Sequence, residues 1–395
     1  MNILFFTYDF PYPTNSGGKT RAFNLIKFAK RDADITLFSF TRNDFQKEHN
    51  DALHALGVHD IFLFPRKSVR DIRNLSSFIL SQSIFSTLYF DRGIFDELLR
   101  VVREKRIDLV QFESFYTGFY LSDVLRDLGV KQVFGTENIE YILYEDNARY
   151  HTDLASRLFF TDQAKKIKRE EEAFYMKADS ILAVTSQEKE YITSRWKKNV
   201  VVIENGVDIA DFTQRKQKKR PENTLVFIGN FSYFPNVDAM KWFMHTVFPL
   251  LPSDIKLIVV GRNSSKMTFL RHERVQAREY VANIKDAYAL GTALIAPIRI
   301  GGGTNFKILE AMASGLPVIA LAERVGSFDF RDGEELLIAS SPQEFVQKTT
   351  ELLQGVALRR RLAMNAKLAV EKNYNWKNIG NKLHAVWASI INEKY

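Results

Sequence analysis

Short apolar runs alternate with helix-like stretches along almost the whole chain of 395 residues. The first series of strand-like runs covers residues 3–7, 35–40, 61–64, 109–112, 132–134, 180–184 and 200–203. A second series covers residues 225–229, 257–260, 293–297 and 318–320. Apolar runs separated by helical segments are typical of parallel strands whose two faces are covered by helices. The alternation therefore predicts an α/β fold with two successive parallel sheets.

The two series are separated by a turn and a polar, basic stretch. Asn205-Gly206-Val207-Asp208 reads as a turn, and residues 213–222 are rich in Lys, Arg and Gln. This composition is typical of a connection between domains. We therefore expect an N-terminal domain at 1–205, a linker at 206–222 and a second domain at 223–374. A hydrophobic content of 46% is ample for two cores.

The stretch Gly-Gly-Gly-Thr-Asn-Phe-Lys-Ile-Leu-Glu at 301–310 predicts a phosphate site. Glycines let backbone N–H groups approach an anion, and the N-terminus of a helix predicted over 304–314 would point toward it. Lys307, about one turn into this helix, is placed to reach phosphate oxygens. Glu310 lies three residues later on the same face, where a carboxylate can accept hydrogen bonds from a ribose diol.

A second glycine pair, Gly17 and Gly18, follows the first predicted strand and would open a helix there. A Walker A loop is excluded, because Pro13 occupies the place of its first glycine. Free N–H groups at the carboxyl edge of an open sheet are a common ligand site, whereas the alternative is a tight strand-to-helix turn. Both interpretations remain open.

Polar residues also follow the fourth and fifth predicted strands. Glu113 ends the run 109–112, and Glu137 and Asn138 follow the run 132–134. Ligands of open α/β sheets bind at the carboxyl ends of the strands, so these side chains are candidates for contacts with a substrate. The alternative is that they are solvated loop residues.

The segment 301–320 closely resembles the nucleotide-sugar loop and helix of retaining glycosyltransferases of family 4, which have the GT-B fold. Asn205-Gly206-Val207-Asp208 resembles the turn that closes the first domain in that family. The resemblance implies two Rossmann-like domains facing each other across a cleft. It also implies that residues 375–395 form a last helix that crosses back to the N-terminal domain, since 374–379 resembles the crossing segment.

The resemblance also implies roles for particular residues. Glu137 stands where many members carry a His near the transferred sugar, and we expect Glu137, Lys307 and Glu310 to be catalytic. Donor contacts are expected from Gly17, Gly18, Asn230, Val281, Gly302, Gly303, Thr304, Lys307 and Glu310, and acceptor contacts from Glu113 and Asn138. Two further positions depart from the family pattern: Asn230 replaces an Arg, and Gly302 replaces a second Glu. Asn236 is interpreted as a helix N-cap.

The function implied is transfer of a sugar from a nucleoside diphosphate donor, UDP or GDP, to a glycan or lipid-linked acceptor. A sugar-nucleotide epimerase, a non-catalytic GT-B partner subunit and a basic nucleic-acid-binding protein are the alternatives. The last has no fold signature here beyond charge. No metal-ligand spacing is present at a convincing place in the sequence, so neither a metal nor another cofactor is expected.

Net charge and one aromatic segment raise the question of membrane contact. The chain carries a formal net charge of +8 and no cysteine, and it starts with a strand-like run rather than a signal peptide, so a cytoplasmic location is expected. Basic residues Arg66, Lys67, Arg70 and Arg73 precede the aromatic run 77–90. This run is either a core helix with a solvated basic face, which we favour, or a contact with the anionic inner face of the plasma membrane.

Overall fold

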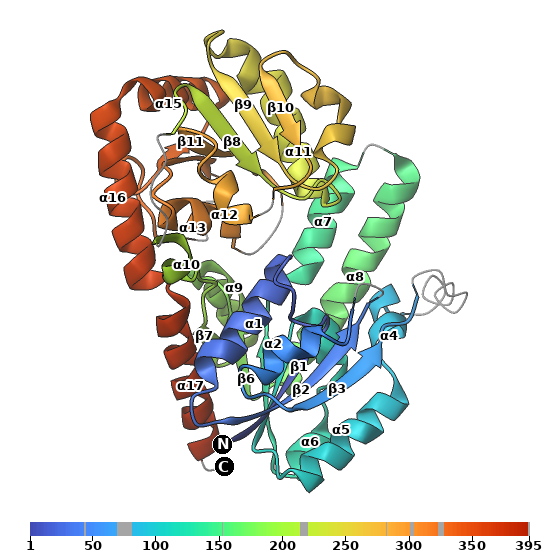
Figure 1. Ribbon diagram of the computed structural model, residues 1–395. Coiled ribbons are helices and arrows are strands. Elements are labelled where there is room, and N and C mark those ends of the chain that lie inside the picture. The colour runs from blue at the N-terminus through green and yellow to red at the C-terminus, as the bar shows by residue number, and fades with distance from the viewer. Residues whose placement is uncertain are drawn as a thin grey trace. The chain divides into compact units, whose positions relative to one another are not determined.

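The computed structural model of the chain describes residues 1–42, 45–68, 81–151, 153–213, 220–281, 283–300, 304–322 and 328–393. The chain divides into two compact units. The N-terminal unit comprises Met1–Asn205 and Trp376–Tyr395, and the C-terminal unit comprises Gly206–Asn375. Each is built on its own parallel sheet (Figure 1), which confirms the predicted α/β fold with two Rossmann-like domains.

In the described part of the N-terminal unit, seven parallel strands form one sheet in the order β3-β2-β1-β4-β5-β6-β7. Their bounds are β1 Asn2–Thr7, β2 Asp34–Thr41, β3 Asp60–Pro65, β4 Leu109–Glu113, β5 Lys131–Gly135, β6 Ser180–Ala183 and β7 Val200–Val202. Every predicted strand of this series is confirmed. The inner strand β1 is buried along Ile3–Phe6, because helices cover both faces of a parallel sheet.

Helices of the N-terminal unit connect successive strands. They are α1 Gly17–Ala29, α2 His49–His54, α4 Ile84–Tyr89, α5 Arg92–Glu104, the 3₁₀ helix η2 Phe115–Tyr120, α6 Asp123–Asp127, α7 Glu140–Tyr150, α8 Leu154–Lys177 and α9 Ser186–Trp196. The predicted helix that opens at Gly17 is therefore confirmed. In α4, Leu88 and Tyr89 are buried in the core, whereas Phe90, directly after the helix, is 38% exposed. Residues 69–80, with Arg70 and Arg73, lie outside the described residues.

The sheet of the C-terminal unit has six described parallel strands in the order β10-β9-β8-β11-β12-β13. Their bounds are β8 Thr224–Ile228, β9 Lys256–Val260, β10 Val275–Arg278, β11 Ala293–Ala296, β12 Val318–Leu321 and β13 Leu337–Ala339. The four inner strands were predicted. The edge strands β10 and β13 were missed, because they are short and β10, Val-Gln-Ala-Arg, lacks an apolar run.

The helices of the C-terminal unit are α10 Ile209–Thr213, α11 Phe234–Trp242, α12 Ile284–Ala287, α13 Phe306–Ala313, α15 Pro342–Gln354 and α16 Val356–Asn373. A π-helical turn, η3 Phe243–Val247, continues α11, and short 3₁₀ turns follow at η4 Phe248–Leu250, η5 Ser264–Lys266 and η6 Thr268–Leu270. Helix α13 begins two residues later than predicted, with Asn305 as its N-cap residue. Helix α10 lies within the stretch expected as linker and packs on α13. Residues 214–219 of that stretch lie outside the described residues.

The last helix, α17 Trp376–Asn392, belongs to the N-terminal unit, as predicted. It packs on α1 so closely at Gly380 that a Cβ there would lie 2.4 Å from Cβ of Phe28. Nε1 of the buried Trp387 donates a hydrogen bond of 2.6 Å to Oε1 of Gln111 on β4. These contacts fix the end of the chain to the first sheet. No helix in the described part of the chain is long and apolar enough to cross a membrane.

Candidate functional site

The candidate donor site lies on α13, which follows the carboxyl end of β11. Lys307 and Glu310 occupy the first turns of this helix, three residues apart, so both project from one face. Thr304 is half-buried and precedes the N-cap residue. Gly302 and Gly303, which we expect to contact the diphosphate, lie outside the described residues. The described part of the predicted site is therefore a helix N-terminus with one cation and one carboxylate.

Glu310 is held by a residue that the sequence did not single out. The hydroxyl of Tyr288, which is completely buried after α12, donates a hydrogen bond to Oε2 of Glu310. Burial raises the pKa of Glu310 above its usual value, while the Tyr288 bond and the charge of Lys307 oppose that rise. Tyr288 thus fixes one carboxylate oxygen of Glu310.

Lys307 lies in an environment that disfavours its charge. Its Nζ donates a hydrogen bond of 2.8 Å to Oδ1 of Asn236 and lies 4.3 Å from the centre of the Phe227 ring. Burial lowers the pKa of Lys307 to about 7, against an opposing effect of Glu310. A carboxamide and an aromatic face cannot replace the hydration of an ammonium group completely. An anion bound here would restore that charge.

The interpretation of Asn236 as an N-cap is wrong. Helix α11 starts at Phe234 with Tyr233 as its N-cap residue, so Asn236 lies inside the first turn. Its Nδ2 donates 2.9 Å to the carbonyl oxygen of Asn230, and its Oδ1 accepts from Lys307. The side chain of Asn230 is exposed and accepts from the N–H of Ser232. Asn236 therefore connects the loop after β8 to the lysine of α13.

A second contact joins α11 to the chain just before residues 301–303. Nη2 of Arg299 lies 2.7 Å from Oδ1 of Asp238, and its Nε also donates to this carboxylate. The guanidinium stacks near the ring of Trp242, with Cζ 5.6 Å from its centre. Helix α11 thus holds the chain before the glycines through Arg299 and after them through Lys307. Val281, the expected base contact, is half-buried against the core of this unit.

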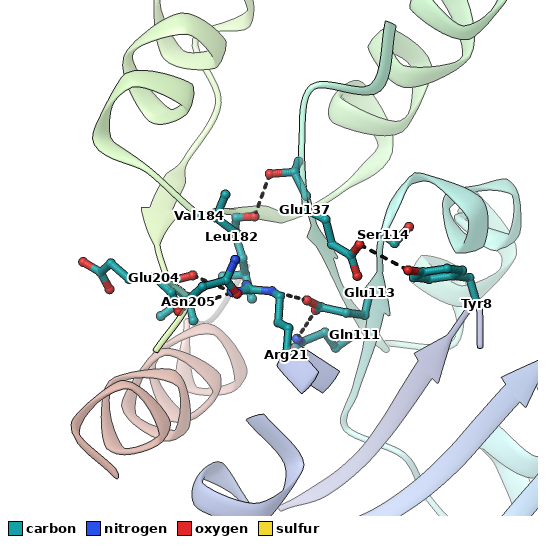
Figure 2. A network of polar contacts seen from close by, with 12 residues as sticks. Tyr8, Arg21, Gln111, Glu113, Ser114, Glu137, Leu182, Val184, Glu204 and Asn205 are labelled. Atoms are coloured by element: carbon teal, nitrogen blue, oxygen red, sulfur yellow. Dashed lines mark hydrogen bonds and ion pairs between the residues drawn. The ribbon is translucent and has the colours of Figure 1, made fainter. Parts of the chain in front are cut away.

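In the N-terminal unit, Gly18 lies under Tyr8 and Glu137. A Cβ at Gly18 would lie 2.2 Å from Oη of Tyr8 and 2.7 Å from Oε1 of Glu137, so a side chain there would displace both. The hydroxyl of Tyr8 donates to Oε2 of Glu137 over 3.4 Å (Figure 2). Oε1 of Glu137 is buried and has no hydrogen-bond partner among the described residues. The structure therefore brings the predicted residues Gly18 and Glu137 together.

The carboxyl group of Glu137 lies among other acids. Burial is the main reason why the pKa of Glu137 rises to about 8, and the charges of Glu113 and Glu140 add to it, while Arg21 lowers it. Burial also raises the pKa of Glu140 to about 7, although Tyr116 donates a hydrogen bond of 2.8 Å to its carboxylate. At neutral pH, Glu137 is therefore mainly protonated. Asn138 is half-buried beside it.

Glu113, which we expected on the acceptor side, is buried in an ion pair. Its Oε1 lies 2.6 Å from Nε of Arg21, its Oε2 accepts 2.7 Å from Nε2 of Gln111, and its exposed fraction is 1%. Nη1 of Arg21 donates in turn to the carbonyl of Ile203 and to Oδ1 of Asn205. Figure 2 shows this network at the end of β4. Glu113 holds α1 to the sheet and does not face solvent.

One further acid that the sequence reasoning missed supports the loop of Glu137. The two carboxylate oxygens of Glu171 on α8 accept hydrogen bonds from the backbone N–H groups of Glu140 and Tyr141. Glu171 therefore caps the N-terminus of α7 from another helix. Single-sequence patterns contain no signal for such a cap, because the residues are about thirty positions apart. No group of three or more His, Asp or Glu side chains that could hold a metal ion occurs among the described residues.

Comparisons with known proteins cover both units. The family model described as Glycosyltransferase Family 4 matches residues 15–211, and that described as Glycosyl transferases group 1 matches residues 222–355. An uncharacterized glycosyltransferase of Methanocaldococcus jannaschii is 24% identical over 244 residues, which are 55% of this chain and 60% of the relative. A phosphatidyl-myo-inositol mannosyltransferase of Propionibacterium freudenreichii is 24% identical over 53% of this chain and 56% of its own length. The chain thus aligns with less than two thirds of these curated relatives.

Solved structures share the fold over the whole chain. Sucrose-phosphate synthase from Thermosynechococcus elongatus matches with a TM-score of 0.73 and 15% identity, covering 99% of each chain. HepE of Anabaena in complex with UDP matches with a TM-score of 0.66 and 13% identity, covering 98% of this chain and 100% of its own. At such identities the likeness shows a common fold.

Proposed function

Because the chain belongs to the GT-B glycosyltransferases, we propose that it transfers a sugar from a nucleoside diphosphate sugar to an acceptor hydroxyl, with retention of the anomeric configuration. The observation that carries this proposal is the placement of Lys307 and Glu310 on one face of α13. Lys307 has an unsatisfied charge, and Glu310 has one oxygen fixed by Tyr288. A diphosphate and a ribose are chemically matched to this pair.

In the proposed reaction, Lys307 and the N-terminus of α13 bind the diphosphate. Cleavage of the bond between the sugar and the diphosphate increases the negative charge on the leaving group, and a positioned cation stabilises that charge. Because Lys307 is half-buried, its interaction with the diphosphate is stronger than in water. The proposal assigns charge neutralisation to these groups and to the backbone of Gly302, Gly303 and Thr304.

Glu137 is the proposed contact for a hydroxyl of the transferred sugar or of the acceptor. Tyr8 fixes its Oε2, and Oε1 is left without a protein partner among the described residues. With a pKa of about 8, the carboxyl group has an O–H that donates a hydrogen bond at neutral pH, and it loses this donor in mildly alkaline solution. Gly17 and Gly18, at the N-terminus of α1, complete the proposed contacts of this unit, with Asn138 beside them.

UDP or GDP is the proposed donor nucleotide, with Val281 and Asn230 beside it, and a glycan or lipid-linked molecule is the proposed acceptor. Related structures of HepE in complex with UDP and with UDP-glucose support a uridine donor. The relative named as a phosphatidyl-myo-inositol mannosyltransferase supports a lipid-linked acceptor. We place the reaction in polysaccharide or glycolipid biosynthesis, in the cytoplasm at the inner face of the plasma membrane.

A two-step experiment tests the proposal. Melting of the purified chain is first measured with UDP, GDP, ADP, TDP and CMP, because a ligand that binds the folded state raises the melting temperature. The matching radiolabelled nucleotide sugar is then incubated with and without a membrane and glycan extract. Extract-dependent transfer of label supports the proposal. Conversion of donor alone to an isomer identifies an epimerase, and the absence of both nucleotide binding and transfer favours a non-catalytic subunit.

A further inference from the structure

A pocket lies at the amino edge of the C-terminal sheet, away from α13's N-terminus. Its volume is about 660 Å³. Its wall includes Asn223, Thr292 and Pro317, which directly precede β8, β11 and β12. Lys307 and Glu310, in contrast, follow the carboxyl end of β11. Since all strands of this sheet are parallel, the pocket and the candidate donor site occupy opposite edges of the same unit.

The pocket carries an excess of positive charge. Its described lining contains four cations, Arg220, Arg359, Arg360 and Lys367, against one carboxylate, that of Glu222. The C-terminal ends of α13 and α15 also reach the pocket, and each helix end contributes roughly half a negative charge. A net charge of about +2 remains after these contributions, because four cations face one carboxylate and two helix ends.

Two of these cations are fixed by backbone carbonyls. Arg220 donates to the carbonyls of Tyr288, Gly291 and Ser314, and burial, without any charged partner, lowers its pKa. Arg359 donates to the carbonyls of two residues at the end of α15. Carbonyl dipoles orient these guanidinium groups and offset only part of their charge. The pocket is thus preorganised for an anion.

The other two cations lie on the exposed face of α16 beside apolar side chains. Within the described chain, Arg360 and Lys367 form no ion pair with a carboxylate. Val356 and Met364 lie on the same helix face, one turn before and after Arg360, and are 51% and 61% exposed. An apolar rim around a basic pocket fits an anion that is attached to an apolar group. The volume is in the range of small-molecule sites, roughly 300 to 1,000 Å³.

We propose that this pocket binds a phosphate group carried by a partly apolar molecule, at a site separate from the donor. Arg360 and Lys367 contact the phosphate, Arg220 and Arg359 supply the positive field, and Val356 and Met364 contact the apolar part. The phosphate belongs either to a soluble phosphorylated metabolite or to the headgroup of an anionic phospholipid. This inference does not rest on the proposed glycosyl transfer.

The test compares the full chain with two double variants. Arg360→Ala/Lys367→Ala removes two cations of the pocket, one exposed and one half-buried, and Lys266→Ala/Arg271→Ala removes two exposed cations of the same unit outside it. One arm measures binding of glycerol 3-phosphate by calorimetry. The other measures co-sedimentation with phosphatidylcholine vesicles that do or do not contain phosphatidylglycerol. The control variant also corrects for binding at the donor site, which both variants retain.

In at least one arm, the pocket variant is expected to bind about tenfold more weakly or worse than wild type, because two charge-assisted contacts are lost. The control variant should remain within about twofold of wild type. If the pocket variant binds glycerol 3-phosphate more weakly than wild type, the ligand is a soluble metabolite. If only its binding to phosphatidylglycerol vesicles is weakened, the ligand is a lipid. Absence of binding in both arms, or equal losses in the two variants, would overturn the proposal.

Discussion

Nζ of Lys307 on α13 donates a hydrogen bond of 2.8 Å to Oδ1 of Asn236 on α11. This bond joins two helices that follow different strands of the C-terminal sheet, and it directs the lysine by means of a neutral acceptor. A carboxylate at position 236 would have satisfied the ammonium group. With a carboxamide, Lys307 retains an uncompensated charge, which an anionic ligand can complete.

Binding of a nucleoside diphosphate should therefore take up a proton above pH 7. The pKa of Lys307 is about 7 in the free protein, and a bound diphosphate raises it. The affinity should fall by up to about tenfold per pH unit above 7, until the pH reaches the pKa of the complex. Calorimetry in buffers of different ionisation enthalpy measures the uptake. Lys307→Met should abolish it, whereas Lys266→Met should not; uptake that persists in Lys307→Met would assign the proton to another group.

Glu310→Ala should weaken nucleotide binding by about 1 to 3 kcal/mol, the range for a hydrogen bond to a charged group. Tyr288→Phe retains the carboxylate and loses the bond that fixes it, so a smaller loss is expected. Glu273→Ala, an exposed carboxylate of the same unit, is the matched control. Calorimetry with the nucleotide selected by melting checks all three. Unchanged affinity in Glu310→Ala would refute its assignment to the ribose.

Glu137→Gln should retain most of the transfer activity at neutral pH, because a carboxamide donates a hydrogen bond as the protonated acid does. With the donor at saturating concentration, so that the titration of Lys307 does not limit binding, wild-type activity should fall as the pH rises through about 8, where Glu137 loses its proton, and the variant should lack this fall. If Glu137→Gln has the same pH dependence of activity as wild type, Glu137 takes no part in the reaction.

Stability provides a readout for Glu137 that is independent of activity. Its pKa is raised from 4.5 to about 8 by folding, so the folded state binds an additional proton between these values. Stability therefore falls as the pH rises from 4.5 to 8. Thermal unfolding of wild type and Glu137→Gln across this range should diverge toward alkaline pH, in favour of the variant. Parallel curves would contradict the raised pKa.

Arg21→Met should destabilise the chain by about 3 to 5 kcal/mol, since it leaves the carboxylate of Glu113 buried without its partner. Arg21→Met/Glu113→Gln should recover part of this loss by removing the charge. Arg100→Met breaks exposed pairs with Glu97 and Glu104, and little change is expected there. Differential scanning calorimetry of the three variants checks this order of destabilisation. Equal effects of Arg21→Met and Arg100→Met would contradict the buried ion pair.

Gly380→Ala should loosen the last helix from the N-terminal unit. An added Cβ would lie 2.4 to 2.7 Å from atoms of Phe28, including its backbone, and such overpacking costs about 1 to 3 kcal/mol. Asn381→Ala, exposed on the same helix, should be neutral or slightly stabilising. Thermal unfolding compares the two. If both alanines had the same effect, α17 would not pack on α1 at this position.

The sequence predicted the elements that depend on local pattern. Buried parallel strands are continuous apolar runs, so seven strands of one sheet and four of the other were found. The edge strand β10 was missed because it is half-exposed and not uniformly apolar, and β13 was missed because it has only three residues. The start of α13 was placed two residues early, since the pattern marks the apolar face of a helix better than its end.

Contacts between distant segments could not be predicted. Tyr288 lies 22 residues from Glu310, and Arg21 lies 92 residues from Glu113, so no spacing rule connects them. The sequence identified Glu113 as a polar residue at a strand end but not its buried partner. It also marked Asn236 as a cap, because an Asn near a helix start is commonly one, whereas here it binds Lys307. The sequence marked Glu113, Asn236 and Glu310 as polar residues of interest, but it did not identify the distant side chains that contact them.

The most direct measurement is a crystal structure of the chain with the nucleoside diphosphate that raises its melting temperature most. Diphosphate oxygens should lie within hydrogen-bond distance of Nζ of Lys307, and the ribose hydroxyls should lie against the carboxylate of Glu310. A nucleotide bound at any other place, with Lys307 still bonded to Asn236 alone, would contradict the proposed donor site.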